Sequence, residues 1–70
     1  MIYNYENERF ENVSIEIVKL KETSSTICAD YIIKSDGQIV SQMRAFCNND
    51  NATDPTNLAM SYIQSLDVFE

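Results

Sequence analysis

The chain has 70 residues, of which 44% are hydrophobic and 23% are charged, with one glycine and one proline. These values are ordinary for a globular domain, so they exclude a disordered or fibrous chain. A chain of this length has room for one domain, which we expect to span residues 1–70 and to have a thin core.

Acidic residues outnumber basic ones by eleven to five, which gives a formal charge of −6 and a pI near 4.3. This charge argues against direct binding to nucleic acid phosphates or to anionic membranes. All basic residues except Arg9 fall in segments predicted below to form a sheet, whereas the two ends of the chain are strongly acidic.

The first ten residues contain neither a basic leader nor an apolar run, and no later stretch is apolar enough to span a bilayer. We therefore expect a cytoplasmic protein in which Cys28 and Cys47 are reduced thiols. The predicted strands also place the two cysteines on opposite faces of a sheet, where a disulfide cannot form.

Residues 1–10 are predicted to form either a short edge strand or a segment whose aromatic side chains lap over the rim of the sheet. The first long strand is predicted at residues 13–21. There the apolar residues alternate up to Ile17 and then change phase at Val18. Either a β-bulge between Ile17 and Val18 turns both apolar sets toward one core, or a regular strand shows apolar side chains on both faces.

The second strand is predicted at residues 26–34, after a polar hairpin loop at residues 22–25. Its core face carries Ile27, Ala29, Tyr31 and Ile33, and its other face carries Cys28, Asp30, Ile32 and Lys34. Asp36 and Gly37 then start a second hairpin. We prefer a three-residue loop there, because it places Ile33 opposite Ile39 and keeps the faces of the third strand, residues 38–47, unmixed.

A helix is predicted at about residues 54–67, with Thr53 or Asp54 as N-cap and Pro55 at its first position. Its apolar stripe consists of Leu58, Ala59, Tyr62, Ile63, Leu66 and Phe69. Regular helix should weaken near Leu66, because Asp67 and Glu70 are unfavourable at the negative end of the helix dipole. The expected fold is thus α+β, a three-stranded antiparallel meander with one C-terminal helix packed on one face.

The absence of histidine removes the commonest general base near neutral pH and every histidine-bearing catalytic triad or zinc site. Two cysteines 19 positions apart cannot complete a zinc site, and a single glycine excludes a glycine-rich phosphate loop. We therefore expect no catalytic residue, no metal and no cofactor, and we expect that the protein is not an enzyme.

Some apolar residues remain once the core face is filled, and these are the candidate partner contacts: Ile15, Ile32, Val40 and Phe46. Ile15 belongs to this set only if the first strand has no bulge. An apolar patch of this kind usually marks an interface. In the opposing interpretation, the bulge in the first strand exists, the N-terminal aromatic residues cover Ile32 and Val40, and Phe46 turns into the end of the core.

The patch predicts a small non-enzymatic protein–protein interaction module that forms a homodimer, through this face or through the strand edge at residues 13–17. The alternative hypothesis is an acidic decoy, of the kind that phages and mobile elements use to inhibit nucleic-acid-binding or defence proteins. Its contact surface would consist of Glu6, Glu8, Glu11 and Asp67. The sequence identifies neither the partner nor the process.

Overall fold

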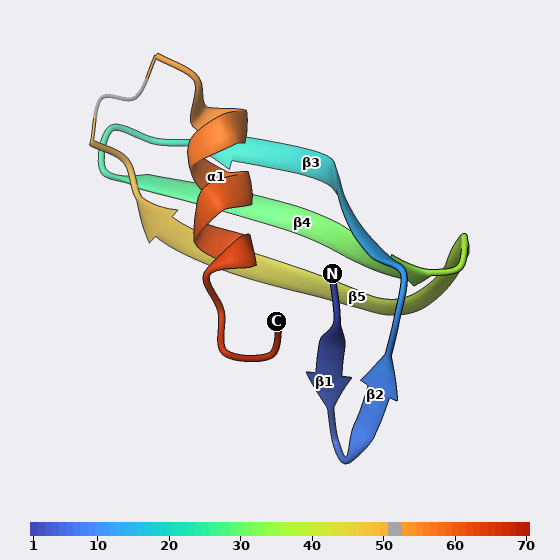
Figure 1. Cartoon of the computed structure of the whole chain (residues 1–70). Coiled ribbons are helices and arrows are strands. Elements are labelled where there is room, and N and C mark those ends of the chain that lie inside the picture. The colour runs from blue at the N-terminus through green and yellow to red at the C-terminus, as the bar shows by residue number, and fades with distance from the viewer. Residues whose placement is uncertain (51–52) are drawn as a thin grey trace.

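The computed structural model describes residues 1–50 and 53–70 of the chain. It contains five strands and one helix: β1 (Tyr3–Tyr5), β2 (Glu8–Phe10), β3 (Val13–Glu22), β4 (Thr26–Ser35), β5 (Gln38–Asn48) and α1 (Pro55–Gln64). β3, β4 and β5 form an antiparallel meander with β4 in the centre, and β1 and β2 form a separate hairpin (Figure 1). The predicted meander and C-terminal helix are confirmed, and the short hairpin is additional.

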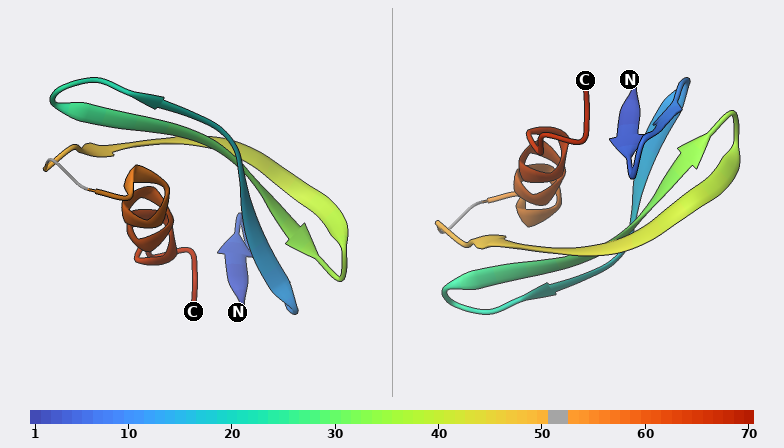
Figure 2. Two further views of the ribbon diagram at one scale, coloured as in Figure 1. Left: turned by 90° about the horizontal axis from the view of Figure 1, so that it is seen from above. Right: turned by 90° about the horizontal axis from the view of Figure 1, so that it is seen from below.

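The helix and the β1–β2 hairpin both lie on the same side of the curved meander (Figure 2). We call this side of β3–β5 the core face and the opposite side the outer face. No element in the described part of the chain covers the outer face. The core face of β4 carries Ile27, Ala29, Tyr31 and Ile33, as predicted, and all four are buried.

β3 contains a β-bulge at Val18. Ile17 pairs with Tyr31 of β4. The next pair is Lys19 with Asp30, so Val18 has no partner on β4 and is 56% exposed. The apolar residues on both sides of the bulge pack against the core: Val13, Ile15, Ile17 and Leu20. Of the two interpretations of the phase change, the bulge is confirmed.

The turn between β4 and β5 is shorter than predicted. Ser35 pairs with Gln38, so the loop holds only Asp36 and Gly37, and both have positive φ (52° and 82°). This is the backbone conformation that a two-residue type I′ turn requires, and Asp-Gly suits it. The predicted three-residue loop is wrong.

A second β-bulge, at Val40, explains why the faces of β5 are nevertheless unmixed. Lys34 pairs with Ile39, and the next pair is Ile33 with Ser41. The extra residue restores the alternation, so that Ala45 lies opposite Ala29 on the core face. Ile39, which was predicted on the core face, is 54% exposed on the outer face, and Val40 instead packs against the core.

Local signals in the sequence set the start of α1. The carboxylate of Asp54 accepts a hydrogen bond of 3.1 Å from the backbone N–H of Asn57, and Pro55 occupies the first position. The helix ends at Gln64 with Ser65 as C-cap, a few residues before the predicted end. Ala59 and Ile63 are buried against the sheet.

Two residues of the predicted apolar stripe behave differently from the expectation. Tyr62 is 40% exposed, and Phe69 lies beyond the helix, where it forms an isolated bridge with Tyr3 of β1. The backbone groups of Ile2 and Glu70 exchange two hydrogen bonds of 3.0 and 2.9 Å. The C-terminal segment therefore lies beside β1 as a short added strand.

The N-terminal hairpin closes one end of the core. Its turn consists of Glu6 and Asn7, both with positive φ. Tyr3 is fully buried, and the rings of Tyr5 and Phe10 both stack with its ring, at centroid distances of 5.8 and 5.9 Å. The expected short strand thus exists, but it pairs with β2 and not with an edge of the meander.

We predict that Ile63→Ala lowers the free energy of unfolding by about 2–4 kcal/mol, because it removes a fully buried side chain from a thin core. The matched control is Tyr62→Ala on the same helix, which should cost no more than about 1 kcal/mol because the ring is largely exposed. Urea unfolding followed by circular dichroism measures both. Equal losses would contradict the placement of α1.

Candidate functional site

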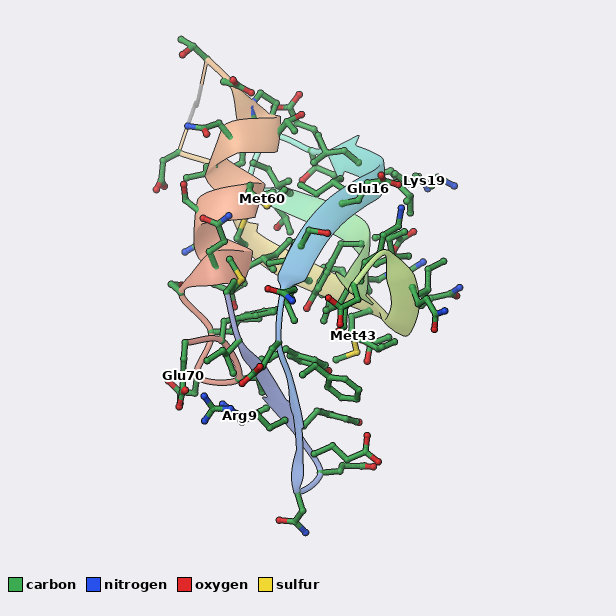
Figure 3. All side chains as sticks on the ribbon, turned by 45° about the vertical axis from the view of Figure 1, so that its right-hand side comes forward. Arg9, Glu16, Lys19, Met43, Met60 and Glu70 are labelled. Carbon is green, nitrogen blue, oxygen red and sulfur yellow. The ribbon has the colours of Figure 1, made fainter. Side chains whose placement is uncertain are left out.

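The outer face of the meander is the candidate site, and its side chains form rows across the three strands. One row consists of Lys19, Asp30 and Arg44, and the next consists of Lys21, Cys28 and Phe46. Glu16 and Lys19 point away from α1 (Figure 3). The outer face therefore carries charged side chains on a surface that the rest of the described chain leaves open.

Asp30 and Arg44 form the closest ion pair of this face. Arg44 Nε lies 2.6 Å from Asp30 Oδ1, and Arg44 Nη2 lies 3.4 Å from Asp30 Oδ2. The hydrogen bond from Arg44 lowers the pKa of the Asp30 carboxyl group, and the charges of Lys19 and Lys21 lower it further. The same hydrogen bond raises the pKa of Arg44.

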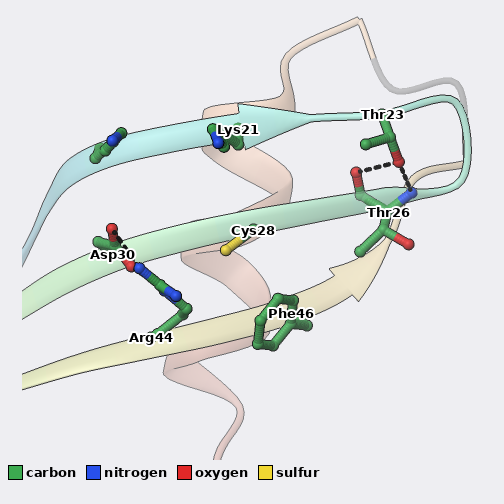
Figure 4. A pocket seen from close by; sticks show the side chains of 8 residues that line it. Lys21, Thr23, Thr26, Cys28, Asp30, Arg44 and Phe46 are labelled. Carbon is green, nitrogen blue, oxygen red and sulfur yellow. Dashed lines mark hydrogen bonds and ion pairs between the residues drawn. The ribbon is translucent and has the colours of Figure 1, made fainter.

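A hollow of about 340 Å³ lies beside this ion pair (Figure 4). We call it the Phe46 hollow, and it is lined by Lys19, Lys21, Thr23, Thr26, Cys28, Asp30, Arg44 and Phe46. The Phe46 ring is 60% exposed. The Thr23 hydroxyl is engaged in the β3–β4 turn, where it accepts a hydrogen bond from the backbone N–H of Thr26. The hollow thus combines an aromatic ring with cationic side chains.

A second, wider hollow of about 680 Å³ lies toward the other end of the sheet. Val18 and Ile39 stand at its rim, and both are more than half exposed because each β-bulge turns one apolar side chain outward. Ile32 also lines this hollow. The outer face therefore offers apolar side chains at both ends, with the Asp30–Arg44 pair between them.

The structure separates the four candidate partner contacts. Phe46 lies exposed on the outer face, as expected. Ile32 faces the same side but is buried. Val40 packs against the core, so its placement on the outer face is wrong, and the cause is the β-bulge in β5. Ile15 was predicted on the outer face only for a first strand without a bulge, and it packs against the core because β3 has one.

Sequence reasoning missed the two apolar residues that the bulges expose, Val18 and Ile39. The phase change after Ile17 was a usable signal for Val18, because a bulged residue has no cross-strand partner. No comparable signal exists for Ile39, because its exposure depends on a bulge that the sequence pattern does not reveal.

The four acidic candidate residues lie at one end of the molecule. Glu6, Glu8 and Glu11 are exposed on or next to the β1–β2 hairpin. Asp67 is exposed in the C-terminal segment, whose next residue, Val68, accepts a backbone hydrogen bond of 2.7 Å from Asn4. We call the hairpin and this segment together the acidic end of the molecule.

The two outer strands of the meander, β3 and β5, differ in how well their edges are protected. β3 carries Lys19, Lys21 and the Val18 bulge, which are features that discourage further strand pairing. β5 is 11 residues long and carries one charged residue, Arg44, and neither proline nor glycine. Within residues 1–50 and 53–70, no backbone group of β5 forms a hydrogen bond outside its ladder with β4.

Both cysteines are free thiols, Cys28 on the outer face and Cys47 on the core face. Burial raises the pKa of Cys47, which lowers the fraction of its reactive thiolate. Among the described residues, no three metal-ligating side chains come together. No helix in the same part of the chain is long and apolar enough to cross a membrane.

No protein-family model matches the chain, no curated protein matches it, and no solved structure matches it. The interpretation of the outer face and of the β5 edge therefore depends on geometry and charge.

We predict that an NMR titration gives Asp30 a pKa below the ordinary aspartate value of about 3.9, and that Arg44→Gln raises it. The folded-state pKa is lowered, so the ion pair stabilises the fold above the unfolded-state pKa and this contribution is lost as pH falls through the folded-state value. An Asp30 pKa that Arg44→Gln leaves unchanged would contradict the ion pair.

Proposed function

We propose that the chain is a non-enzymatic protein-interaction module that pairs with a second copy of itself along the free edge of β5. The observation that carries this proposal is the unprotected β5 edge. A long edge strand with unpaired backbone groups is a template for pairing with another chain, and most proteins protect such strands with charges, prolines or bulges. In β5 the bulge at Val40 lies near one end, which leaves residues 41–48 regular.

The occupant we propose is a second copy, because a two-fold axis through β5 pairs the strand with itself in the antiparallel direction. The result is a continuous sheet with twice the number of long strands. β5 brings one charged residue to the paired strands, Arg44, whereas β3 would bring four from each copy, namely Glu16, Lys19, Lys21 and Glu22. Pairing also adds support to a domain whose size limits its core.

The β5 pairing leaves the outer face accessible in both copies, because strands pair edge to edge and not face to face. The side chains of Phe46, Val18 and Ile39 would remain open to a further protein. The module would therefore use its edge for self-association and its outer face for a partner.

We predict a mass of about 16 kDa, twice the 8.0 kDa of one chain, by light scattering after size exclusion at micromolar concentration. Each copy carries a charge of −6, so raising the salt concentration should strengthen the dimer by screening the repulsion between copies. Gln42→Lys places a charge in the middle of β5 and should yield a monomer.

The matched control for this experiment is Ser14→Lys, which places the same charge on the exposed edge strand β3 and should leave the dimer intact. Circular dichroism verifies that both variants are folded. A wild-type monomer at all concentrations would sink the proposal, and so would a dimer that Gln42→Lys does not weaken.

The acidic end favours a second candidate function, the acidic decoy. Five of the eleven acidic residues lie on or next to the hairpin or in the C-terminal segment, and the hairpin that carries Glu6 and Glu8 protrudes from the body of the molecule (Figure 1). A protruding acidic hairpin could occupy the basic groove of a nucleic-acid-binding protein. Such binding would depend on charge more than on shape.

Under the decoy hypothesis, the triple variant Glu6→Gln, Glu8→Gln, Glu11→Gln loses most of its affinity for a basic protein such as a nuclease recovered from the source cell. The loss should resemble that caused by raising the salt concentration, because both remove the same electrostatic attraction. Calorimetric titration measures it. Affinity that is indifferent to salt and to the triple variant would rule the decoy out.

A further inference from the structure

The Phe46 hollow contains two cationic side chains without a partner. The described residues hold three ion pairs, Arg9–Glu11, Lys34–Glu16 and Arg44–Asp30. Lys19 and Lys21 take part in none of them, although both line the hollow. Asp30, the one carboxylate in the lining, is already held by Arg44. The hollow therefore has two ammonium groups available for an anionic ligand.

The opposite side of the hollow is apolar. The Phe46 ring is exposed on β5, and Cys28 lies between Phe46 and Lys21 in the same row of the sheet (Figure 4). An exposed aromatic ring beside a small apolar side chain buries another apolar group with little loss of conformational entropy. A ligand that fits this lining has an apolar side chain next to one or two negative charges.

We propose that the Phe46 hollow binds an acidic peptide segment of a partner protein, with an apolar side chain of the segment against Phe46 and its carboxylates on Lys19 and Lys21. This inference deepens the proposed function, because it assumes an interaction module and names the chemistry of its partner. Charge complementarity carries it, because the outer face holds four of the five basic residues of a strongly acidic chain.

The same arrangement fits nucleic acid less well. Nucleic-acid-binding proteins commonly neutralise about 6–10 phosphates, whereas the hollow offers two free ammonium groups and one arginine that Asp30 already holds. Two ammonium groups match the one or two carboxylates of a short peptide segment. The acidic end would oppose a long polyanion more than a short peptide, because charges separated by more than the Debye length of about 8 Å at physiological salt are largely screened and a short peptide need only contact the hollow.

The test uses the full chain and a fluorescein-labelled synthetic peptide of sequence EDLFED, with fluorescence anisotropy as the readout. We expect saturable binding that weakens as the salt concentration rises, the opposite of the salt effect on the β5 dimer. The uncharged peptide QNLFQN should bind about tenfold more weakly, because it lacks the carboxylates that contact the two ammonium groups.

Three variants locate the binding. The double variant Lys19→Gln, Lys21→Gln and the single variant Phe46→Ser should each reduce affinity by about tenfold. The control is Lys34→Gln, which removes the same charge from the same face but outside the hollow, and it should bind as the wild type does. Phe46 and both lysines are on the surface, so these substitutions should leave the fold intact, as circular dichroism can verify.

Several results would overturn the proposal. One is that EDLFED does not bind, and another is that QNLFQN binds with the same affinity. Tighter binding of a single-stranded oligothymidylate than of EDLFED would also contradict it, as would a loss of affinity in Lys34→Gln as large as in the double variant. If the lysine double variant dissociated the wild-type dimer, the hollow would hold the acidic end of a second copy and not a partner peptide. The β5 proposal fails separately, through a monomeric wild type, so the two failures can be told apart.

Discussion

The architecture depends on two β-bulges that keep the apolar residues of the meander on one face. Without the bulge at Val18, the residues before and after it in β3 would face opposite sides, and the core would lose half of that strand. The bulge at Val40 has the same role in β5, where it corrects the alternation that a two-residue turn would otherwise disturb. A domain of this size has a thin core, so the loss of part of that core would strongly lower its stability.

The bulges also determine the character of the surface. Each one expels a single apolar side chain, Val18 in one strand and Ile39 in the other, onto a face that no described element covers. Four of the five basic residues lie on that face, whereas the hairpin and the C-terminal segment form an acidic end. One molecule thus presents three distinct surfaces, namely a cationic sheet face, an acidic end and an unprotected strand edge.

The main elements could be predicted from the sequence because their signals are local. Alternation placed three strands, and Asp54 followed by Pro55 placed the start of the helix. The β4–β5 turn could not be predicted, because a three-residue loop and a two-residue loop followed by a bulge put Ser41 and the residues after it on the same faces. The β1–β2 hairpin was equally hidden, since its turn uses Glu6 and Asn7 in left-handed conformations without a glycine.

The candidate site could be predicted only where its residues depend on local signals and not on the cross-strand register. Phe46 could be placed from alternation, because β5 is regular beyond its bulge. Val40 and Ile39 exchanged faces because alternation cannot detect a bulge next to a turn. Lys19 and Lys21 were recognised as charges on a strand edge, but their convergence on one hollow with Phe46 depends on the cross-strand register, which only the structure supplies.

The central claim is that β5 is a pairing edge and β3 is not, and amide hydrogen exchange at two protein concentrations tests it most directly. In a dimer paired through β5, the outward N–H groups of that strand should be protected at high concentration and should exchange freely after dilution, whereas those of β3 should exchange freely at both. Outward β5 amides that exchange equally fast at both concentrations would contradict the claim. Protection that appears on β3 instead would show that β3, and not β5, is the pairing edge.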